Sequence, residues 1–526
     1  MVLSPKTYTF LCGCFAALGS ILFGYDLGVI AGVLPAPDFL RVMDLEDDPN
    51  GNWIGFISSS LLLGAFCGCI PASLAADMLS RRTAIFIGAL WFILGGVLQT
   101  AAMNRGMMLA GRFIGGFAIG QLSFLAPLYQ TEIAHPSNRG RLATLQQFFL
   151  GIGALIASFI VYALEVTQPG TVMQWRLPLG LQLFPCIPLA SMIFLFPESP
   201  RWLMSVGREE DAIASLARLH AHGDIHDPFV VNEAAEIKAG VMYDKQAEQG
   251  WKKVLGDKSN LRRVFIGVML QFSVQMTGVS CIQYYSPQIF AAIGFAKEKT
   301  FLFQSINSII ALIAQAICVF FCDRIGFRPL LIYCNLVSSA TFAVGTALQA
   351  EFPADPNNPD ATNTSASYAF VMMTWIFNFA FSLGIGPISW AVPPAIFTTG
   401  IRSKGTALSS MSAWIANFMI GQVSPKAFES IGWRYYVVFC ILSFTNAIAM
   451  WALIPEVVGR DLESIDELLR EEPWFIPRSA ALRKKVKGTD VEDKIRNGEH
   501  PAPAAKLDGL EYDEKKEGTT TMVEHI

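Results

Sequence analysis

Long apolar segments separated by short polar breaks occupy most of the chain. Twelve such segments lie near residues 8–34, 53–76, 83–103, 107–130, 142–165, 175–196, 263–293, 301–322, 329–350, 368–397, 405–428 and 432–455. A helix that crosses the hydrocarbon core of a bilayer needs about 20 predominantly apolar residues. Because backbone polar groups in hydrocarbon must be satisfied within the segment, each stretch is predicted to be a spanning α-helix. The pattern therefore predicts an all-α polytopic membrane protein.

A polar, charged stretch divides the twelve segments into two groups of six. We expect residues 1–196 to form an N-terminal six-helix bundle and residues 263–456 a C-terminal one. Residues 197–262 contain short amphipathic stretches and are predicted to be a cytoplasmic linker with short helices. Residues 457–526 are polar and include a basic run, and we expect this cytoplasmic tail to be largely disordered.

The composition agrees with lipid as the solvent. Of the 526 residues, 52% are hydrophobic and only 16% are charged, whereas a soluble domain normally carries about a quarter charged residues. The formal net charge of −4 gives no reason to expect nucleic acid as a partner. Most of the ten cysteines lie inside apolar segments and show no metal-ligand spacing, so we expect no metal and no cofactor. We find no nucleophile-and-base arrangement or phosphate loop, so an enzyme is not expected.

Basic residues cluster in alternate short loops, which orients the chain. The pairs that fall on one side are Arg81 with Arg82, Arg139 with Arg141, Arg324 with Arg328, and Arg402 with Lys404. Because short loops rich in Lys and Arg stay in the cytoplasm, both termini are predicted to be cytoplasmic. The same topology places the glycosylation sequon at Asn363 outside.

The two halves repeat one another. Asp77 and Arg81 after the second helix are echoed by Asp323 and Arg328 after the eighth, about 246 residues further on. The pair Pro197 and Glu198 is likewise echoed by Pro455 and Glu456. A nearly constant offset indicates duplicated six-helix bundles. Transporters built from such repeats bind substrate near the midplane between the halves and open alternately to each side.

Several short motifs occur in order along the membrane segments. They are Gly24, Tyr25 and Asp26; Gly111 and Arg112 with Gly115 and Gly116; Glu132 before Arg139, Gly140 and Arg141; Pro197 to Leu203; Tyr284 to Pro287; Asp323 to Gly326; Gly386 and Pro387 with Trp390; and Pro455 and Glu456 with Gly459. With these motifs the chain resembles the sugar porter family of the major facilitator superfamily, and its general layout is similar to fungal members.

The resemblance implies a function as well as a fold. It predicts the major facilitator fold and import of a monosaccharide, a hexose or pentose, by proton symport through alternating access. The partners would be the sugar, a proton and the lipid bilayer, with the protein acting as a monomer in the plasma membrane. Three alternatives stay open: an energy-independent sugar facilitator, a porter of a polyol or a sugar acid such as galacturonate or quinate, and a sugar sensor that does not transport.

Two charges lie within apolar helices. Asp26 falls in the first predicted helix and Arg112 in the fourth, where an unpaired charge costs at least about 2.5 to 3.5 kcal/mol. We expect them to face each other or water. They could form a static ion pair, or a switch in which protonation of Asp26 releases Arg112. The resemblance favours the switch, since proton-coupled plant hexose and bacterial xylose porters have this acid and facilitative human glucose transporters lack it.

The resemblance also suggests which side chains contact the sugar. Amides can bond its hydroxyls and an indole can cover its C–H face, and the positions carried over are Gln147, Gln275, Asn307, Trp390 and Asn417. Each of these could instead make an interhelical contact. Tyr284 and Tyr285 correspond to an outer gate, with ordinary interfacial tyrosines as the alternative.

A cytoplasmic charge network is expected at the inner helix ends. It comprises Glu132, Arg139, Arg141, Glu198, Arg201, Asp323, Arg324, Arg402 and Glu456. Some positions depart from the family pattern. Val274, Ser280 and Ala413 replace amides near the sugar, so glucose preference cannot be assumed, and Ala395 removes one acid from the network. Met78, Ser80 and Phe327 interrupt the loop motifs.

Overall fold

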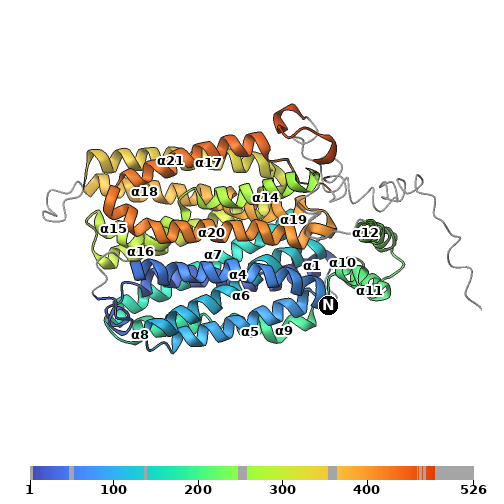
Figure 1. Ribbon diagram of the computed structural model, residues 1–526, viewed down its shortest axis with the longest axis horizontal. Helices are drawn as coiled ribbons and strands as arrows, with labels where there is room; N and C mark the ends of the chain where they lie inside the picture. Colours follow the sequence, from blue (N-terminus) through green and yellow to red (C-terminus); the bar gives the residue numbers. More distant parts are fainter. Residues whose placement is uncertain are drawn as a thin grey trace, which may run out of the picture.

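The computed structural model describes residues 4–46, 52–135, 139–246, 258–353, 364–458, 460, 465 and 469–479. These residues form helices and connecting turns without a β-strand. Figure 1 shows two stacked bundles of long helices, with a group of short helices at one end. The sequon at Asn363 and the tail beyond Ser479 lie outside the described residues, and so do the side chains of Arg139 and Arg141.

The N-terminal bundle contains six spans, of which the first and last are interrupted. Its helices are α1 (Pro5–Ala16), α2 (Leu18–Val33), α3 (Pro37–Val42), α4 (Asn52–Leu79), α5 (Arg81–Thr100), α6 (Arg105–Ile133), α7 (Arg139–Thr167), α8 (Met173–Leu181), α9 (Cys186–Met192) and the 3₁₀ turn η2 (Ile193–Leu195). Helices α1 and α2 together form the first span, and α8 to η2 form the sixth.

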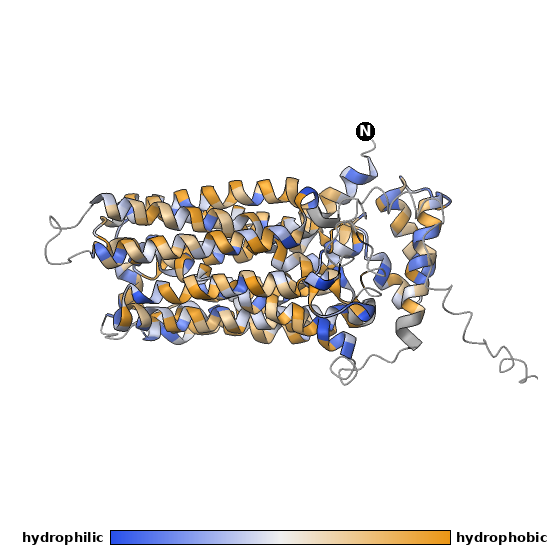
Figure 2. Ribbon diagram, turned by 90° about the horizontal axis from the view of Figure 1, so that it is seen from above, coloured by the Kyte–Doolittle hydropathy of each residue, from blue (hydrophilic) through white to orange (hydrophobic). Residues whose placement is uncertain are grey.

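Three short helices follow the first bundle and lie outside both bundles. They are α10 (Pro200–Ser205), α11 (Glu209–His220) and α12 (Pro228–Gln246), and they share a small apolar core that includes Leu216 and Val230. Figure 2 shows them beyond one end of the hydrophobic bundles. We call this end of the molecule the linker end and the other the opposite end.

The C-terminal bundle repeats the six spans. Its helices are α14 (Lys258–Gln275), α15 (Val279–Ala292), α16 (Lys297–Ile325), α17 (Phe327–Glu351), α18 (Thr364–Ala380), the π-helix η4 (Phe381–Ile385), α19 (Gly386–Ile396), α20 (Thr399–Ile431), α21 (Arg434–Leu453) and the 3₁₀ turn η5 (Ile476–Arg478). Leu469 and Ile476 are buried against the base of this bundle.

The prediction of an all-α membrane protein with twelve helices is confirmed. Within the described residues, eleven segments are long and apolar enough to cross a bilayer. Helix α20 is the twelfth and is 33 residues long. Its composition is more polar because it carries Ser409, Ser412, Asn417 and Gln422 on its way through the bundle.

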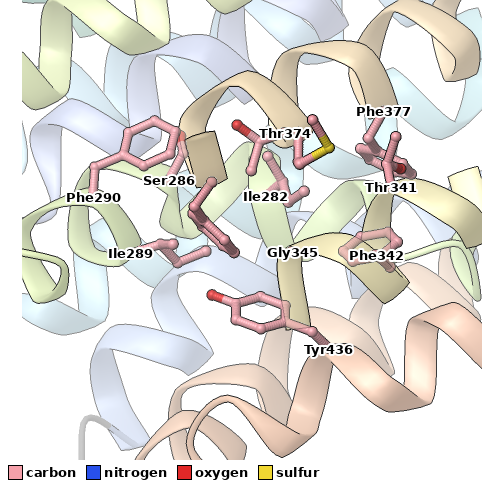
Figure 3. Close-up of a pocket in the computed structure, with 12 residues that line it drawn as sticks. Ile282, Ser286, Ile289, Phe290, Thr341, Phe342, Gly345, Thr374, Phe377 and Tyr436 are labelled. Carbon is pink, nitrogen blue, oxygen red and sulfur yellow. The ribbon is translucent and has the colours of Figure 1, made fainter. Parts of the chain in front are cut away.

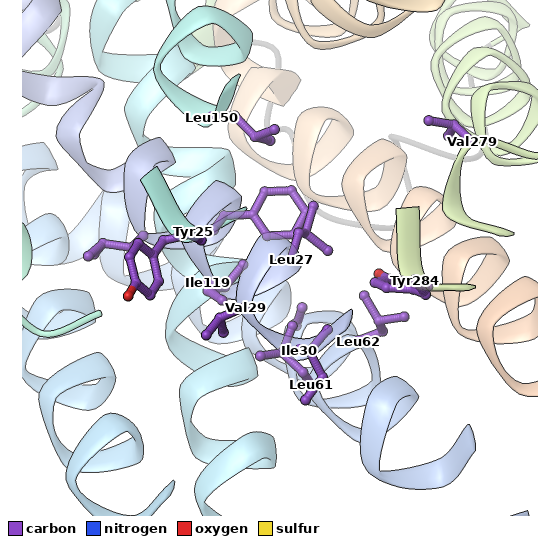
Figure 4. Packing of buried hydrophobic residues seen from close by; sticks show 14 of the residues in the cluster. Tyr25, Leu27, Val29, Ile30, Leu61, Leu62, Ile119, Leu150, Val279 and Tyr284 are labelled. Carbon is purple, nitrogen blue, oxygen red and sulfur yellow. The ribbon is translucent and has the colours of Figure 1, made fainter. Parts of the chain in front are cut away.

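Glycines let neighbouring helices approach closely. A Cβ built on Gly24 of α2 would lie 1.8 Å from the carbonyl oxygen of Leu150 on α7, and one on Gly116 of α6 would lie 1.9 Å from that of Leu61 on α4. Small residues commonly serve this purpose between membrane helices. Figure 4 shows the apolar side chains that surround these crossings, among them Leu27. Gly24 and Gly116, which belong to the family motifs, are therefore packing positions.

Two helix interruptions shape the middle of the C-terminal bundle. Helices α14 and α15 are separated by Gly278, whose φ of 86° is left-handed, a conformation that glycine adopts without steric cost. The π-helix η4 interrupts α18 and α19, and such single turns are frequent at functional sites. Contacts between the halves run mainly along α4 with α20 and α7 with α16.

Candidate functional site

A polar cavity lies between the two halves. It encloses about 550 Å³ of empty space with its open mouth included. Helices α2 and α7 of the first half and α15, α16, α18 and η4 of the second contribute to it. The lining residues are Leu27, Gly28, Gln147, Leu150, Gly151, Ala154, Gln283, Gln304, Asn307, Ser308, Ala311, Gln315, Asn378, Phe381 and Ser382.

Helical periodicity brings the amides of this cavity onto common faces. On α16, Gln304, Asn307 and Ser308 are followed by Gln315 at spacings that keep them on one side of the helix. Gln315 lies eleven positions after Gln304, which corresponds to about 16 Å along the axis. None of the described residues that line the cavity is charged. The surface can therefore bond a ligand through amides and hydroxyls.

Two of the five predicted sugar ligands line this cavity. Gln147 comes from α7, and its Nε2 lies 3.3 Å from the position of a Cβ built on Gly386. Asn307 comes from α16, and its backbone carbonyl accepts a hydrogen bond from Asn378 Nδ2 at 3.0 Å. Gln147 therefore extends across the interface between the halves.

The other three predicted ligands are not among the lining residues. Gln275 is half-buried, and its Oε1 accepts a hydrogen bond from Ser280 Oγ at 2.7 Å. Trp390 is buried, with its ring centroid 6.0 Å from that of Trp414, which in turn lies 5.0 Å from Phe23 of α2. These rings pack the two halves against each other.

Asn417 and the predicted gate residues form one group towards the opposite end. Tyr284 Oη donates to Asn417 Oδ1 at 3.2 Å, and Tyr285 Oη donates to the carbonyl of Gly421 at 2.7 Å. Both tyrosines are buried. Helix α4 joins them, because Ser59 Oγ donates to Gln422 Oε1 at 3.0 Å. Residues 417–422 of α20 thus hold α15 and α4 together.

The two intramembrane charges form a buried ion pair. Arg112 Nη1 donates to Asp26 Oδ1 at 3.1 Å and to Oδ2 at 3.3 Å, and both side chains are 1% exposed. The remaining guanidinium donors reach backbone carbonyls of α4, with Nε bonded to Ile57 at 3.0 Å and Nη2 to Ser58 at 3.2 Å. Arg112 therefore links α2, α6 and α4.

Buried acids and arginines join helices at the linker end of the first half. Glu132 accepts two bonds from Arg81, at 2.8 and 2.9 Å, and one from Ser199 Oγ at 2.6 Å. Glu198 accepts a bond from Arg82 Nε at 3.1 Å and one from its own neighbour, the backbone N–H of Ser199, at 2.9 Å. These contacts fix the start of α5 against α6 and α10.

Glu456, the counterpart of Glu198 in the second half, bonds to backbone N–H groups. Glu456 accepts from the backbone N–H groups of Phe327, Arg328 and Val458 at 3.0, 3.1 and 3.1 Å. The acid thus caps the first turn of α17. Burial raises the pKa of the Glu456 carboxyl, and the hydrogen bonds from these backbone N–H groups partly offset the effect.

Four other residues of the predicted charge network make different contacts. Arg402 Nη2 donates to the carbonyl of Phe397 at 3.3 Å, and Arg324 lies over the ring of Phe321 at 5.6 Å. Arg201 is buried, and Asp323 lies beside the thiol of Cys322 at 3.9 Å. The network prediction did not assign roles to Arg81 and Arg82. Arg81 and Arg82 follow Asp77, which is echoed by Asp323 in the second half, and this repeat was the signal that could have identified them.

Cavity residues from the second half were also missed. Gln283, Gln304, Gln315 and Asn378 all line the cavity, but none was among the positions carried over from the resemblance. The sequence signal was an amide within an apolar helix at every one of these positions. A buried amide is costly in an apolar environment unless it is hydrogen-bonded, so each could have been considered a candidate.

A second pocket lies inside the C-terminal bundle. Figure 3 shows Ile289, Phe290, Phe342 and Tyr436 around it, and it encloses about 350 Å³ of empty space. Its walls are mostly apolar, which suits the hydroxyls of a sugar poorly. Ser286, which lines this pocket, is hydrogen-bonded to Gln304 of the polar cavity.

Comparisons with known proteins agree on one family. A family model described as "Sugar (and other) transporter" matches residues 12–469. High-affinity glucose transporter 1 of Candida albicans is 29% identical over 517 residues, covering 94% of each chain. The MFS-type transporter oryC of Aspergillus oryzae is 30% identical over 473 residues, covering 89% of this chain and 86% of the relative.

Solved structures show the same fold. The proton:xylose symporter XylE bound to 6-bromo-6-deoxy-D-glucose superposes with a TM-score of 0.78 at 24% identity. The match covers 88% of this chain and 99% of the symporter.

Proposed function

This chain belongs to the sugar transporter family of the major facilitator superfamily, and from that premise we propose that it imports a monosaccharide together with a proton across the plasma membrane. It is a transporter and not an enzyme. Relatives from Candida albicans and Kluyveromyces lactis are named as high-affinity glucose transporters, and the solved structure belongs to a proton:xylose symporter. These names support a hexose or pentose as substrate and a proton as the coupled ion.

The Asp26–Arg112 pair carries the proposal of proton coupling. An acid that is 1% exposed inside a membrane bundle is expensive to keep charged, and a guanidinium stays protonated under all physiological conditions. Protonation of Asp26 would remove the attraction to Arg112 but leave its bonds to the carbonyls of α4. The pair can thus change the packing of α2 against α6 and α4 when a proton binds.

Polar contacts on α4 connect this pair to closure of the opposite end. Arg112 holds the carbonyls of Ile57 and Ser58, and the next residue, Ser59, bonds Gln422 of α20. Movement of the guanidinium would therefore shift the part of α4 that meets the second half. We infer that proton binding biases whether α4 and α20 stay together, which is the coupling that symport requires.

The linker end is the proposed cytoplasmic side. The basic residues of the short loops lie there, including Arg81, Arg82 and Arg402, as expected for cytoplasmic loops. The opposite end, closed by Tyr284, Tyr285 and α20, would then face the outside. Alternating access would open these two ends in turn around the polar cavity.

Uptake measurements test this function. The full chain is expressed in cells that lack their own hexose carriers, and accumulation of labelled D-glucose, D-galactose and D-xylose is followed with and without a protonophore. We expect accumulation above the external concentration that the protonophore abolishes. Equilibration that ignores the protonophore would identify a facilitator, and surface-expressed protein that carries none of the sugars would refute monosaccharide transport.

A further inference from the structure

The α16 wall of the polar cavity carries acceptors that have no partner. Asn307 Oδ1 and Gln315 Oε1 are buried, and neither bonds to any described residue. Their side chains are only 4% and 3% exposed. An unpaired buried acceptor costs a folded protein about 1 to 3 kcal/mol, so each such group needs an explanation. A ligand hydroxyl that donates to these oxygens would supply one.

Gly151 of α7 makes room for the second of these amides. A Cβ built on Gly151 would lie 1.9 Å from Gln315 Oε1, so the amide occupies the space that any other residue would fill. Gly151 and Gln315 both line the cavity and come from opposite halves. The Gln315 amide therefore lies at the interface between the bundles, where substrate is expected.

The described residues that line the cavity are all uncharged, which restricts what the cavity can accept. Among the described residues, the polar lining consists of Gln147, Gln283, Gln304, Gln315, Asn307, Asn378, Ser308 and Ser382, without a lysine, arginine or histidine. A carboxylate is an acceptor only, and it would face the two unpaired oxygens without a cation to balance its charge. A neutral substrate with several hydroxyls can donate a different hydroxyl to each of these oxygens.

We propose that Asn307 and Gln315 are specificity-determining residues that select an uncharged polyhydroxylated substrate and reject the corresponding carboxylate. This inference rests on the proposed function and extends it, because it excludes sugar acids such as galacturonate from the substrates. Gln304 and Gln283 extend the same amide surface towards the opposite end. Each substrate hydroxyl that contacts this amide surface exchanges a hydrogen bond to water for a hydrogen bond to an amide.

The first test compares two substrates that differ at a single carbon. D-galactose and D-galacturonate differ only in a hydroxymethyl or carboxylate group at C6, and D-glucose with D-glucuronate forms a second such pair. We expect labelled galactose or glucose to enter while the matching uronate stays at background. Entry of a uronate at a rate equal to its neutral partner would overturn the inference but not membrane transport. If neither member of either pair enters, and D-xylose does not enter either, the proposed function is overturned and this inference with it.

The second test changes the acceptors. Gln315→Leu removes an unpartnered oxygen, and we expect the apparent KM for the transported sugar to rise about 5- to 150-fold, the equivalent of about 1 to 3 kcal/mol. Gly151→Ala keeps the amide but displaces it, so KM should rise in the same direction. Gly151→Ala decides the question if Gln315→Leu does not reach the surface.

Gln146→Leu is the matched control. Gln146 is also buried with an unpaired Oε1, but its Nε2 bonds the carbonyl of Ser123 on α6 and it does not line the cavity. We expect its KM to equal that of the wild type at equal surface expression. Unchanged KM in both Gln315→Leu and Gly151→Ala, with sugar uptake intact, would show that the amides do not select the substrate.

Discussion

Ser80 and Gly326 have nearly the same backbone conformation at equivalent points of the two halves. The first has φ 103° and ψ 159°, and the second φ 100° and ψ 154°. Each lies immediately before the first residue of a long helix, α5 or α17. This region of backbone space is essentially restricted to glycine. The two halves therefore share this turn, but the first half has a serine where the second half has a glycine.

Replacing Ser80 with glycine should stabilise the protein. A residue forced into such a conformation costs about 1 to 3 kcal/mol, although Ser80 recovers part of this because its Oγ accepts from the backbone N–H of Thr83 at 3.3 Å. We expect Ser80→Gly to raise the thermal unfolding midpoint of the purified protein. The reverse change, Gly326→Ser, should lower it, since a Cβ there would lie 2.5 Å from Glu456 Oε2. A lower midpoint for Ser80→Gly would contradict the strain argument.

Removing one partner of the Glu132–Arg81 pair should have the opposite effect. Glu132→Gln removes the charge that pairs with the buried guanidinium of Arg81, and breaking a buried ion pair typically costs about 3 to 5 kcal/mol. Thermal unfolding measures the change. The exposed pair of Arg208 with Asp211 is the control, because both side chains are more than half exposed and surface pairs contribute little. Equal effects of Glu132→Gln and Asp211→Asn would show that burial does not matter here.

The sequence predicted the helices, and it gave the contact between Asp26 and Arg112 as one of two expected outcomes, because each depends on a local or pairwise constraint. Length and apolar composition determine a spanning helix, and a charge such as Asp26 inside one needs a partner such as Arg112. The breaks at Gly278 and η4, in contrast, depend on how neighbouring helices pack. Cavity membership was also not predictable in full, because it depends on which face α15, α16 and α18 turn towards α7. Gln283 and Gln315 look like any other polar residue in an apolar segment until that rotation is known.

The two groups of predicted sugar ligands should respond differently to truncation. Gln147 lines the cavity, whereas Gln275 is bonded to Ser280 away from it. Gln147→Ala should raise the apparent KM by the equivalent of about 1 to 3 kcal/mol, and Gln275→Ala should raise it less. Concentration-dependent uptake at equal surface expression measures both. A larger effect at Gln275 would place the sugar nearer the break at Gly278.

Loosening the proposed outer gate should expose a buried thiol. Tyr285→Phe removes the donor to the carbonyl of Gly421, and leaving that acceptor unpaired favours separation of α15 from α20. Cys281 lies on α15 and is fully buried, so its alkylation by a membrane-impermeant reagent, followed by mass spectrometry, reports the opening. We expect faster labelling in Tyr285→Phe than in the wild type. Tyr333→Phe, at a side chain that is 68% exposed, should leave the rate unchanged, and equal rates in all three proteins would argue against the gate.

Replacing Asp26 with asparagine should separate sugar movement from proton movement. The asparagine resembles the protonated acid in shape but cannot exchange a proton, so the pair with Arg112 would stay in one state. Concentrative uptake should disappear, because each proton that enters with a neutral sugar contributes about 2.3 kcal/mol per 100 mV of inside-negative potential, and an uncharged substrate alone cannot use that potential. Exchange of labelled for unlabelled sugar across the membrane should persist, since the cavity is unchanged.

The measurements for this variant are sugar-induced inward current, cytosolic acidification and counterflow. The wild type should show all three, and Asp26→Asn only counterflow. Arg112→Leu is the harsher comparison, because it leaves Asp26 buried without its partner and removes two bonds to α4, so both folding and exchange should suffer. Should Asp26→Asn still accumulate sugar against a gradient with an unchanged proton current, the pair would be a static link between α2 and α6, and the coupled proton would have to bind elsewhere.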